Sequence, residues 1–270
     1  RELFTSADLS LFFAEATAIY LEWIHDWHHW RQRRDRSIRS LEFPFPRYCP
    51  GQRELAVAAY RTLARGGRLF IEAPTGIGKT ISVLFPALKA MAEGKLERIF
   101  YLTARTVGRA VAEKAVADLR AGGLRLRSLT LTAREKICFQ AGQLCDPNSC
   151  PFARSYYDRY RPAMQAVLAQ ETITRPALEA VSRTHEVCPF ELSLDLSLWV
   201  DAVVCDYNYV FDPKVYLRRH FDNAPGAYGF LIDEAHNLVD RGRDMFSAEL
   251  HSGDLREVRR AIKEIGRAHV

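Results

Sequence analysis

The sequence predicts an α/β fold in which a mostly parallel sheet is covered by helices on both faces. Short apolar runs of strand length alternate along the chain with amphipathic runs of helical spacing. A glycine-rich segment near residue 76 separates one such run from a helix, and another run ends in carboxylates at residues 233 and 234. Because parallel strands need crossover connections, which are usually helices, this alternation indicates a parallel sheet.

The individual elements follow from the same patterns. Helical spacing predicts helices over 12–30, 53–65, 81–91 and 106–119, and a new helix from residue 254. Apolar runs predict strands over 69–71, 99–102, 124–131, 200–205 and 228–232. The basic stretch 31–39 is interpreted as a linker whose arginines either lie on a solvated helix face or touch DNA. Phe43-Pro44-Phe45-Pro46 breaks any helix, so the next domain begins there.

A phosphate-binding loop is predicted between the strand at 69–71 and the helix that follows it. Glycines let backbone N–H groups curl around phosphate oxygens, and the helix N-terminus adds the positive end of its dipole. Lys79 supplies a charge to the β- and γ-phosphates, and the Thr80 hydroxyl can coordinate Mg²⁺. The usual first glycine of the pattern is alanine here. The residues predicted to contact the nucleotide are Ala73, Pro74, Thr75, Gly76, Ile77, Gly78, Lys79 and Thr80.

A second motif follows the apolar run at 229–232, where the chain continues as Asp233-Glu234-Ala235-His236. Mg²⁺ prefers oxygen ligands at about 2.1 Å and keeps several waters. Asp233 would therefore hold the metal, mostly through water, while Glu234 would orient and activate the attacking water. The alternative is a solvated acidic turn after a strand. With the loop upstream, the sequence predicts a protein that binds a nucleoside triphosphate and belongs to a machine that hydrolyses it.

Composition adds general limits. With 270 residues, 48% of them hydrophobic, the chain can bury a full core and carry an inserted module. Its net charge of +5 suits a polyanionic partner without requiring one. We see no apolar run long enough to span a membrane and no signal-peptide core, so we expect no membrane partner and a cytoplasmic location of bacterial type.

Four of the six cysteines lie in the segment 136–199, at positions 138, 145, 150 and 188. No two form a C-x-x-C pair, so the usual spacing of a zinc site is absent. Uneven spacing with one distant residue, and proline after two of the cysteines, suits an iron–sulfur cluster. Zinc and unremarkable thiols remain open from the spacing alone, and disulfides do not suit a reducing cytosol.

Together, these elements resemble the XPD/DinG-like branch of superfamily 2 helicases. Four stretches match the family's motifs in order, with the cysteine segment before the last: 43–52, 73–80, Tyr101-Leu102-Thr103-Ala104-Arg105-Thr106 and 233–236. Residues 203–209 also resemble the strand that precedes the family's Asp-Glu-Ala-His box. The resemblance covers residues 43 to 245 and implies a RecA-like P-loop NTPase fold with an inserted helical module.

The resemblance also implies cofactors, partners and residue roles. A [4Fe–4S] cluster would be held by Cys138, Cys145, Cys150 and Cys188. ATP and Mg²⁺ would drive translocation on single-stranded DNA, 5′ to 3′, and act on DNA junctions. Gln52 would recognise adenine, and His236 would join Lys79, Asp233 and Glu234 in catalysis by coupling hydrolysis to the nucleic acid. The residues expected to touch the DNA backbone are Thr103, Arg105 and Thr106.

The same comparison divides the chain. We expect a tail of an upstream domain and basic linker at 1–42, the first motor domain at 43–136 and 199–245, the iron–sulfur insertion at 137–198 and the start of an arch-like helical domain at 246–263. Residues 264–270 correspond to one frame of a common sequencing adapter, so we expect them to be adapter-encoded and the reading frame to be cut there.

The predicted function is an ATP-dependent DNA helicase of repair or recombination, acting as a monomer. Nothing here resembles the second motor domain, whose arginine would reach the γ-phosphate and can contribute about 10³–10⁵ in rate. We therefore expect the isolated chain to bind ATP weakly and hydrolyse it poorly. One alternative is an ATP-switched nucleic-acid-binding protein without unwinding activity. Another is a metal-stabilised interaction domain with a decayed ATP site, against which the intact Lys79 and Glu234 argue.

One stretch of the insertion carries both tyrosines and arginines. They are Tyr156, Tyr157 and Tyr160 beside Arg154, Arg159 and Arg161. Stacked aromatics contribute about 1–3 kcal/mol per base to single-strand binding. The stretch is therefore either a strand-separating surface or a set of tyrosines that pack over the cluster, and the sequence leaves both open.

Overall fold

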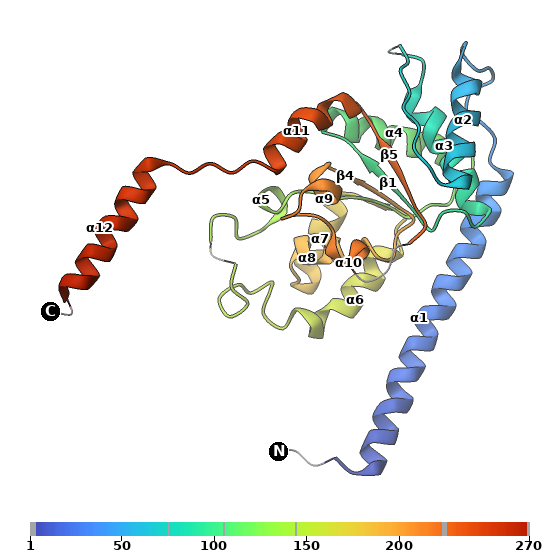
Figure 1. Cartoon of the computed structure of the whole chain (residues 1–270). Coiled ribbons are helices and arrows are strands. Elements are labelled where there is room, and N and C mark those ends of the chain that lie inside the picture. The colour runs from blue at the N-terminus through green and yellow to red at the C-terminus, as the bar shows by residue number, and fades with distance from the viewer. Residues whose placement is uncertain (1–3, 75, 105, 144, 223–225, 269–270) are drawn as a thin grey trace.

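A five-stranded parallel sheet forms the centre of the protein (Figure 1). The structure is a computed structural model and describes residues 4–74, 76–104, 106–143, 145–222 and 226–268. Every pairing in the sheet is parallel, which confirms the predicted α/β class. The strand order is β3-β2-β4-β1-β5. The strands are β1 (Arg98–Leu102), β2 (Ser128–Thr130), β3 (Thr172–Ile173), β4 (Ala202–Cys205) and β5 (Tyr228–Ile232).

Helices connect the strands and extend from both ends of the fold. The first half contains α1 (Ser6–Ser40), α2 (Gln52–Arg65), α3 (Lys79–Ala92), α4 (Thr106–Ala121) and α5 (Arg134–Ile137). The insertion contains α6 (Tyr156–Leu168), α7 (Arg175–His185) and α8 (Pro189–Leu196). The remaining helices are α9 (Asn208–Phe211), α10 (Arg218–Phe221), the 3-10 turn η1 (Ala235–Asn237), α11 (Leu238–Met245) and α12 (Ser252–Ala268).

Each face of the sheet supports its own hydrophobic core. Successive side chains of a strand point to opposite faces, so the residues of β1 divide between the two cores. Ile99 and Tyr101 pack against α3, α4 and the end of α1, where Leu88 is fully buried. Phe100 and Leu102 pack on the other face against the insertion helices α6, α7 and α8. The insertion is therefore part of the cover of the sheet. Its predicted boundaries, 137 and 198, stay predictions.

Helix α1 runs ten residues beyond the predicted end at residue 30, through the basic stretch. The reason is a buried polar network at its C-terminal half. Asp201, just before β4, accepts hydrogen bonds from Arg34 Nη1 at 2.7 Å and from Trp30 Nε1 at 2.9 Å. Arg34 is 2% exposed, so the expectation of a solvated linker is wrong at this residue. Packing against the sheet extends the helix where local sequence predicted a boundary.

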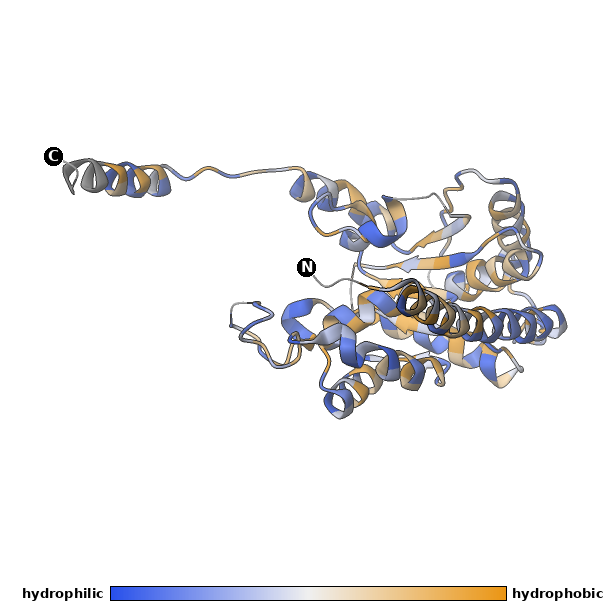
Figure 2. Cartoon of the chain, turned by 90° about the horizontal axis from the view of Figure 1, so that it is seen from below, coloured by the Kyte–Doolittle hydropathy of each residue, from blue (hydrophilic) through white to orange (hydrophobic). Residues whose placement is uncertain are grey.

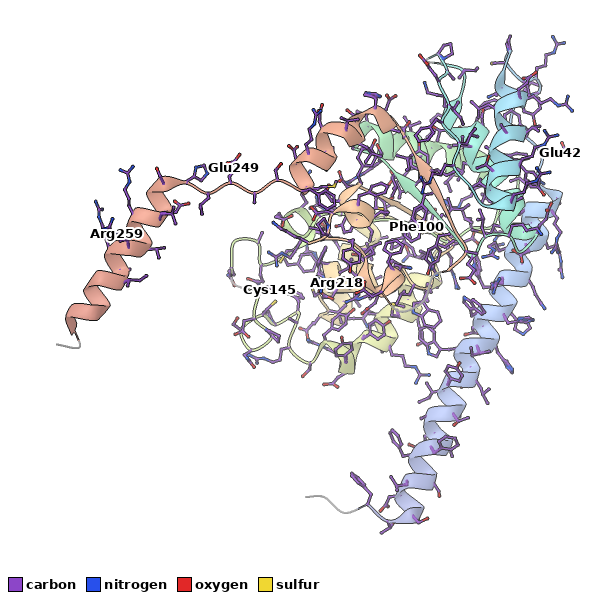
Figure 3. The ribbon with its side chains drawn as sticks, viewed as in Figure 1. Glu42, Phe100, Cys145, Arg218, Glu249 and Arg259 are labelled. Atoms are coloured by element: carbon purple, nitrogen blue, oxygen red, sulfur yellow. The ribbon has the colours of Figure 1, made fainter. Side chains whose placement is uncertain are left out.

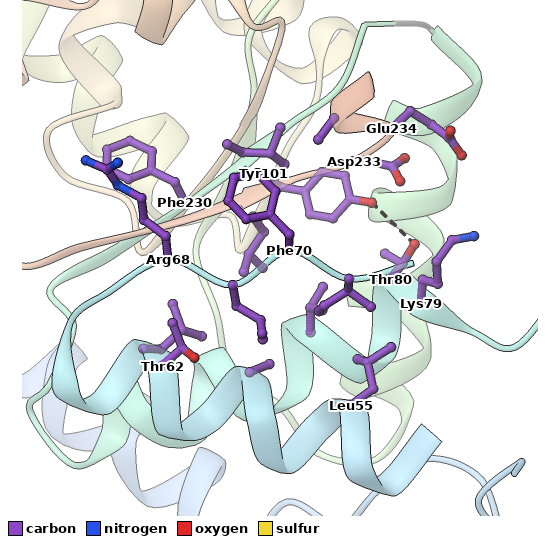
Figure 4. A pocket seen from close by; sticks show the side chains of 18 of the residues that line it. Leu55, Thr62, Arg68, Phe70, Lys79, Thr80, Tyr101, Phe230, Asp233 and Glu234 are labelled. Atoms are coloured by element: carbon purple, nitrogen blue, oxygen red, sulfur yellow. Dashed lines mark hydrogen bonds between the residues drawn. The ribbon is translucent and has the colours of Figure 1, made fainter. Parts of the chain in front are cut away.

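The strand predicted at 69–71 is absent from the structure. Residues 66–74 adopt no strand, and Phe70 is 88% exposed. A strand needs a partner for its backbone groups, and among the described strands β5 pairs only with β1. A cavity of about 1260 Å³ separates the segment from the exposed apolar side chains of β5, Phe230 and Ile232 (Figure 4). The apolar run is present, but no ladder forms.

Both ends of the chain project from the body of the fold (Figure 1). The first half of α1 and the coloured part of α12 mix hydrophilic with hydrophobic residues along their length (Figure 2). In α12, Leu255, Val258 and Ile262 follow helical spacing and are exposed. Among the described residues, no helix combines the length and hydropathy that a bilayer crossing requires.

Candidate nucleotide-binding site

The predicted phosphate loop leads directly into α3. Gly76 and Gly78 have φ values of +86° and +76°, in the left-handed region that favours glycine. A side chain at Gly78 would also meet Gln52 Nε2 at 2.8 Å. Lys79 is the first residue of α3, so the loop ends at the positive end of a 14-residue helix. Thr75 lies outside the described residues.

Lys79 and Gln52 both bind the backbone of the loop. Lys79 Nζ donates to the carbonyl of Ala73 at 2.9 Å, which holds the ammonium group at the mouth of the loop. Gln52 is 3% exposed and donates to the carbonyl of Ile77 at 3.0 Å, while its own oxygen accepts from the N–H of Cys49. Gln52 therefore fixes the loop from α2. Its predicted contact with adenine stays a prediction.

The two predicted magnesium ligands meet at a tyrosine that sequence reasoning did not assign to the site. Tyr101, near the end of β1, lies 3.3 Å from the Thr80 hydroxyl through its own hydroxyl (Figure 4). Tyr101 also lies close enough to Asp233 to favour the ionised form of its carboxyl group. Burial raises the pKa of Tyr101, so its proton stays available to these partners at neutral pH. The signal in the sequence was its position on a buried strand that ends at the same edge as β5.

Asp233 follows β5 and its backbone N–H donates to the carbonyl of Leu102, which aligns it with the end of β1. Partial burial, and then the neighbouring charge of Glu234, raise the pKa of Asp233. Because burial and Glu234 both disfavour the ionised form of Asp233, a cation bound beside it would stabilise that form. Asp233, Thr80 and Lys79 lie together at one end of the large cavity, so the structure brings together the residues predicted from two distant motifs (Figure 4).

Glu234 occupies a strained turn. Its φ of +50° is unusual for a residue with a side chain, and such outliers concentrate at functional sites. Tyr207, two residues after β4, holds this turn in place, because its hydroxyl donates to the carbonyls of both Asp233 and Glu234. His236 Nδ1 lies 3.3 Å from Glu234 Oε2, and both side chains are largely exposed. The carboxylate is thus presented to the open end of the cavity.

The start of α4 packs against this site. A Cβ at Gly108 would lie 2.0 Å from Thr103 Oγ1 and 3.3 Å from Asp233 Oδ2, so only glycine fits. Thr103 is 3% exposed, which places it beneath the surface expected to touch DNA. Arg105 lies outside the described residues, and the side chain of Thr106 is not described. The predicted DNA contacts of these three residues stay predictions.

The four cysteines of the insertion do not all lie close together. Cys138 and Cys188 lie near each other, and burial raises the pKa of the Cys188 thiol. Cys150 follows a turn, and Cys145 lies exposed on the loop that extends from the module (Figure 3). Over the described ranges, no three His, Cys, Asp or Glu side chains come near enough to share a metal ion.

The tyrosines of the insertion divide between packing and exposure. Tyr156 is buried and donates to Asp195 Oδ2 at 2.8 Å. Tyr160 packs against the hydrophobic core, and burial raises its pKa to about 12. Tyr157 is 79% exposed. Packing therefore accounts for two of the three rings, and of these three only Tyr157 is available to a base.

Comparison with known proteins identifies the family. The DEAD_2 family model matches residues 103–255, which is more than half of the chain. The chain belongs to the DEAD_2 family. The matched DEAD_2 region begins at the end of β1 and includes the cysteine module and the Asp233–His236 motif. The resemblance to XPD-like superfamily 2 helicases is confirmed.

Relatives of this DEAD_2 chain are longer than it is. The general transcription and DNA repair factor IIH helicase subunit XPD of Dictyostelium discoideum is 22% identical over 224 residues, covering 73% of this chain and 29% of that protein. A regulator of telomere elongation helicase 1 homolog from Oryza sativa subsp. japonica is 28% identical over 157 residues, 53% of this chain and 15% of that protein. The chain spans about a third of the XPD relatives it matches.

A solved structure supports the fold. A structure titled XPD helicase superposes with a TM-score of 0.53 at 17% identity, covering 74% of this chain and 35% of that one. The RecA-like architecture predicted for the DEAD_2 chain is thereby confirmed.

Proposed function

We propose that this chain is the nucleotide-binding motor part of an ATP-dependent DNA helicase. In this proposal ATP hydrolysis drives movement along single-stranded DNA, 5′ to 3′, and separates duplex in DNA repair or recombination. The observation that carries it is that Thr80 and Asp233 meet at Tyr101, at the carboxyl edge of a parallel sheet, with Lys79 at the same end of the cavity. The relatives that are named as helicase subunits of a DNA repair factor support the same conclusion.

Each residue of the site would have a separate role in ATP hydrolysis. Lys79 would exchange the carbonyl of Ala73 for oxygens of the β- and γ-phosphates, which lie at the N-terminus of α3. Thr80 and Asp233 would hold Mg²⁺, and Tyr101 would orient both ligands. The ion, when bound, neutralises charge on the phosphates. Glu234 would orient and activate the attacking water from its strained turn.

DNA is the proposed partner. The net charge of +5 and the helicase relatives support a single strand or a junction as the ligand. Thr103, Arg105 and Thr106 are proposed to lie near the strand, and His236 is proposed to couple it to Glu234. The proposal also includes a monomer in a reducing cytoplasm of bacterial type, where free cysteines persist.

A [4Fe–4S] cluster is proposed for the insertion. Four thiols in one module fit the donor set of a cubane cluster, which would brace the loop between α5 and α6. The test is the iron and acid-labile sulfide content of protein purified without oxygen. About four of each per chain, absent from Cys150→Ser and kept in the exposed control Cys49→Ser, would support the cluster. Zinc, or no metal, would remove it from the proposal.

The helicase proposal is tested at two residues that act at different steps. Lys79→Ala should abolish binding of a fluorescent ATP analogue to this chain. Glu234→Gln, made in the complete natural polypeptide, should keep that binding but lose DNA-stimulated hydrolysis and strand displacement. Glu249→Gln, an exposed carboxylate far from the site, serves as the matched control (Figure 3). Strand displacement that survives Glu234→Gln would refute the assigned role, and binding without displacement in the wild type would favour an ATP-switched binding protein.

A further inference from the structure

The backbone carbonyl of Glu234 accepts hydrogen bonds from two separate segments of the chain. The backbone N–H of Asn237 donates to it at 3.0 Å and the side-chain Nδ2 of the same residue at 2.9 Å. The hydroxyl of Tyr207 donates to it at 3.1 Å and also donates to the carbonyl of Asp233. Burial, and then the neighbouring carboxylates, raise the pKa of Tyr207 to about 12, so the hydroxyl keeps its proton at neutral pH.

These bonds hold a backbone conformation that Glu234 would not adopt by itself. Its φ of +50° and ψ of +46° lie in the left-handed region, which is disfavoured for a residue with a side chain. Without the donors at its carbonyl, the backbone would return to negative φ. That change rotates the Cα–Cβ bond and turns the carboxylate away from its present direction. The hydrogen bonds to the carbonyl therefore set where the carboxylate points, although they do not touch it.

The segment that carries Tyr207 is itself held by an arginine of α11. Tyr207 is fully buried and belongs to the core on the insertion side of the sheet. Arg241 Nη2 donates to Asp206 Oδ1 and to Asn208 Oδ1, both at 2.7 Å, and these two residues flank Tyr207 in the sequence. Because α11 follows the Glu234 turn in the chain, Arg241 and Tyr207 connect this helix back to the turn that precedes it.

We propose that Tyr207 and Arg241 are positioning residues for ATP hydrolysis: Tyr207 holds the Glu234 turn, and Arg241 holds the segment of Tyr207. The assignment rests on the proposed function for the role of Glu234, and on these contacts for the two residues. Neither residue belongs to the described lining of the large cavity, so we expect both to affect the rate and not the binding of ATP. A displacement of about 1 Å at a catalytic group can cost about a hundredfold in rate.

The test is DNA-stimulated ATP hydrolysis by the complete natural polypeptide. Tyr207→Phe keeps the aromatic ring in the core and removes only the hydroxyl. It should lower kcat and kcat/KM together by about tenfold and leave KM unchanged, as the loss of an interaction that acts in the transition state does. Tyr209→Phe is the matched control, because it removes a buried hydroxyl two residues further on that donates to the Thr132 carbonyl at 3.4 Å. It should hydrolyse ATP as the wild type does.

A second variant tests the contact from α11. Arg241→Gln should lower kcat by about threefold, a smaller effect that fits a partly exposed ion pair acting at one remove. In the double variant, kcat should equal that of Tyr207→Phe alone, because Arg241 acts through the hydroxyl that is then missing. Two independent structural defects would instead multiply their losses. Arg243→Gln, which breaks the exposed pair with Asp240 on the same helix, is the matched control and should leave kcat unchanged.

The outcomes separate this inference from the proposed function. If Tyr207→Phe has the kcat of the wild type, the positioning role is wrong while the helicase proposal stands. If Tyr209→Phe loses as much rate, or if Tyr207→Phe also loses binding of a fluorescent ATP analogue, general damage to the domain explains the effect and the role is again wrong. Losses that multiply in the double variant would remove Arg241 from the assignment. If the wild type hydrolyses no ATP in the presence of DNA, the proposed function fails and the positioning role fails with it.

Discussion

Removal of the Asp201 carboxylate should destabilise the whole domain, because this residue fastens α1 to the sheet. Asp201 is 4% exposed and accepts three hydrogen bonds, from Arg34 Nη1 at 2.7 Å, Trp30 Nε1 at 2.9 Å and the backbone N–H of Arg127 at 2.8 Å. The substitution Asp201→Ala leaves the guanidinium of Arg34 buried with only Asp35 beside it among the described ion-pair partners. It also leaves the indole and the amide without these acceptors.

The magnitude follows from these contacts. Breaking a buried ion pair by removing one partner costs about 3–5 kcal/mol where the remaining charge has no other partner, and here Asp35 still balances part of the Arg34 charge. Unsatisfied neutral donors cost about 1–3 kcal/mol each, and part of that overlaps with the ion-pair figure. We therefore expect Asp201→Ala to lower the free energy of unfolding by about 3–5 kcal/mol. Urea unfolding followed by circular dichroism measures this as a shift of the midpoint.

A double-mutant cycle tests the cause. Asp201→Asn keeps an oxygen that can accept from Trp30 and Arg127 but loses the negative charge. If the ion pair is the cause, the double variant Asp201→Asn with Arg34→Met should lose less free energy of unfolding than the sum of the two single variants. Asp240→Asn, in the exposed pair with Arg243, should leave the midpoint unchanged. A midpoint for Asp201→Ala that matches the wild type, or strictly additive effects in the cycle, would refute the view that this ion pair holds α1 in place.

Two further predictions concern acid stability and the nucleotide site. His220 is buried between Ser197 and Arg98, and burial lowers its pKa to about 3, so the unfolded chain takes up a proton first. Stability should fall as pH drops from about 6.5 toward 3, by up to about 1.4 kcal/mol per unit, and urea midpoints for His220→Gln should fall less steeply over this range. Gly108→Ala should weaken Mg²⁺-dependent binding of a fluorescent ATP analogue, because its Cβ would meet Thr103 at 2.0 Å. The control Gly242→Ala has free space around it and should bind the analogue as the wild type does, whereas equal binding by Gly108→Ala would contradict the packing argument.

Sequence patterns predicted the parts of the fold that depend on local chemistry. The strand predicted at 228–232 matches β5, and the strand predicted at 99–102 lies within β1. Both are apolar runs that the sheet buries on one or both faces. The loop from Ala73 to Gly78 was predictable because glycines must stand where φ is positive. These features are encoded within a few residues of where they occur.

Contacts between distant residues were not predictable in the same way. Tyr101 was matched as part of a motif, yet its role between Thr80 and Asp233 depends on three elements that meet only in the folded sheet. Likewise, the basic stretch after residue 30 has the composition of a solvated linker, yet the carboxylate of Asp201, 167 residues beyond Arg34, and the burial of Ile38 in the core make it a packed helix. A single arginine carries no local sign that its partner lies so far along the chain.

The failed strand at 69–71 has a related cause. Leu69, Phe70 and Ile71 have the apolar character of a buried strand, and Phe230 and Ile232 on β5 share it. All five side chains are exposed in the structure and face or border the same cavity. Apolar character predicts burial, but a strand forms only where a neighbour supplies its hydrogen bonds, and the described residues supply none at the outer edge of β5. The sequence therefore predicted correctly that residues 69–71 and β5 are apolar. Whether residues 69–71 pair as a strand depends on a neighbouring strand, which local patterns cannot reveal.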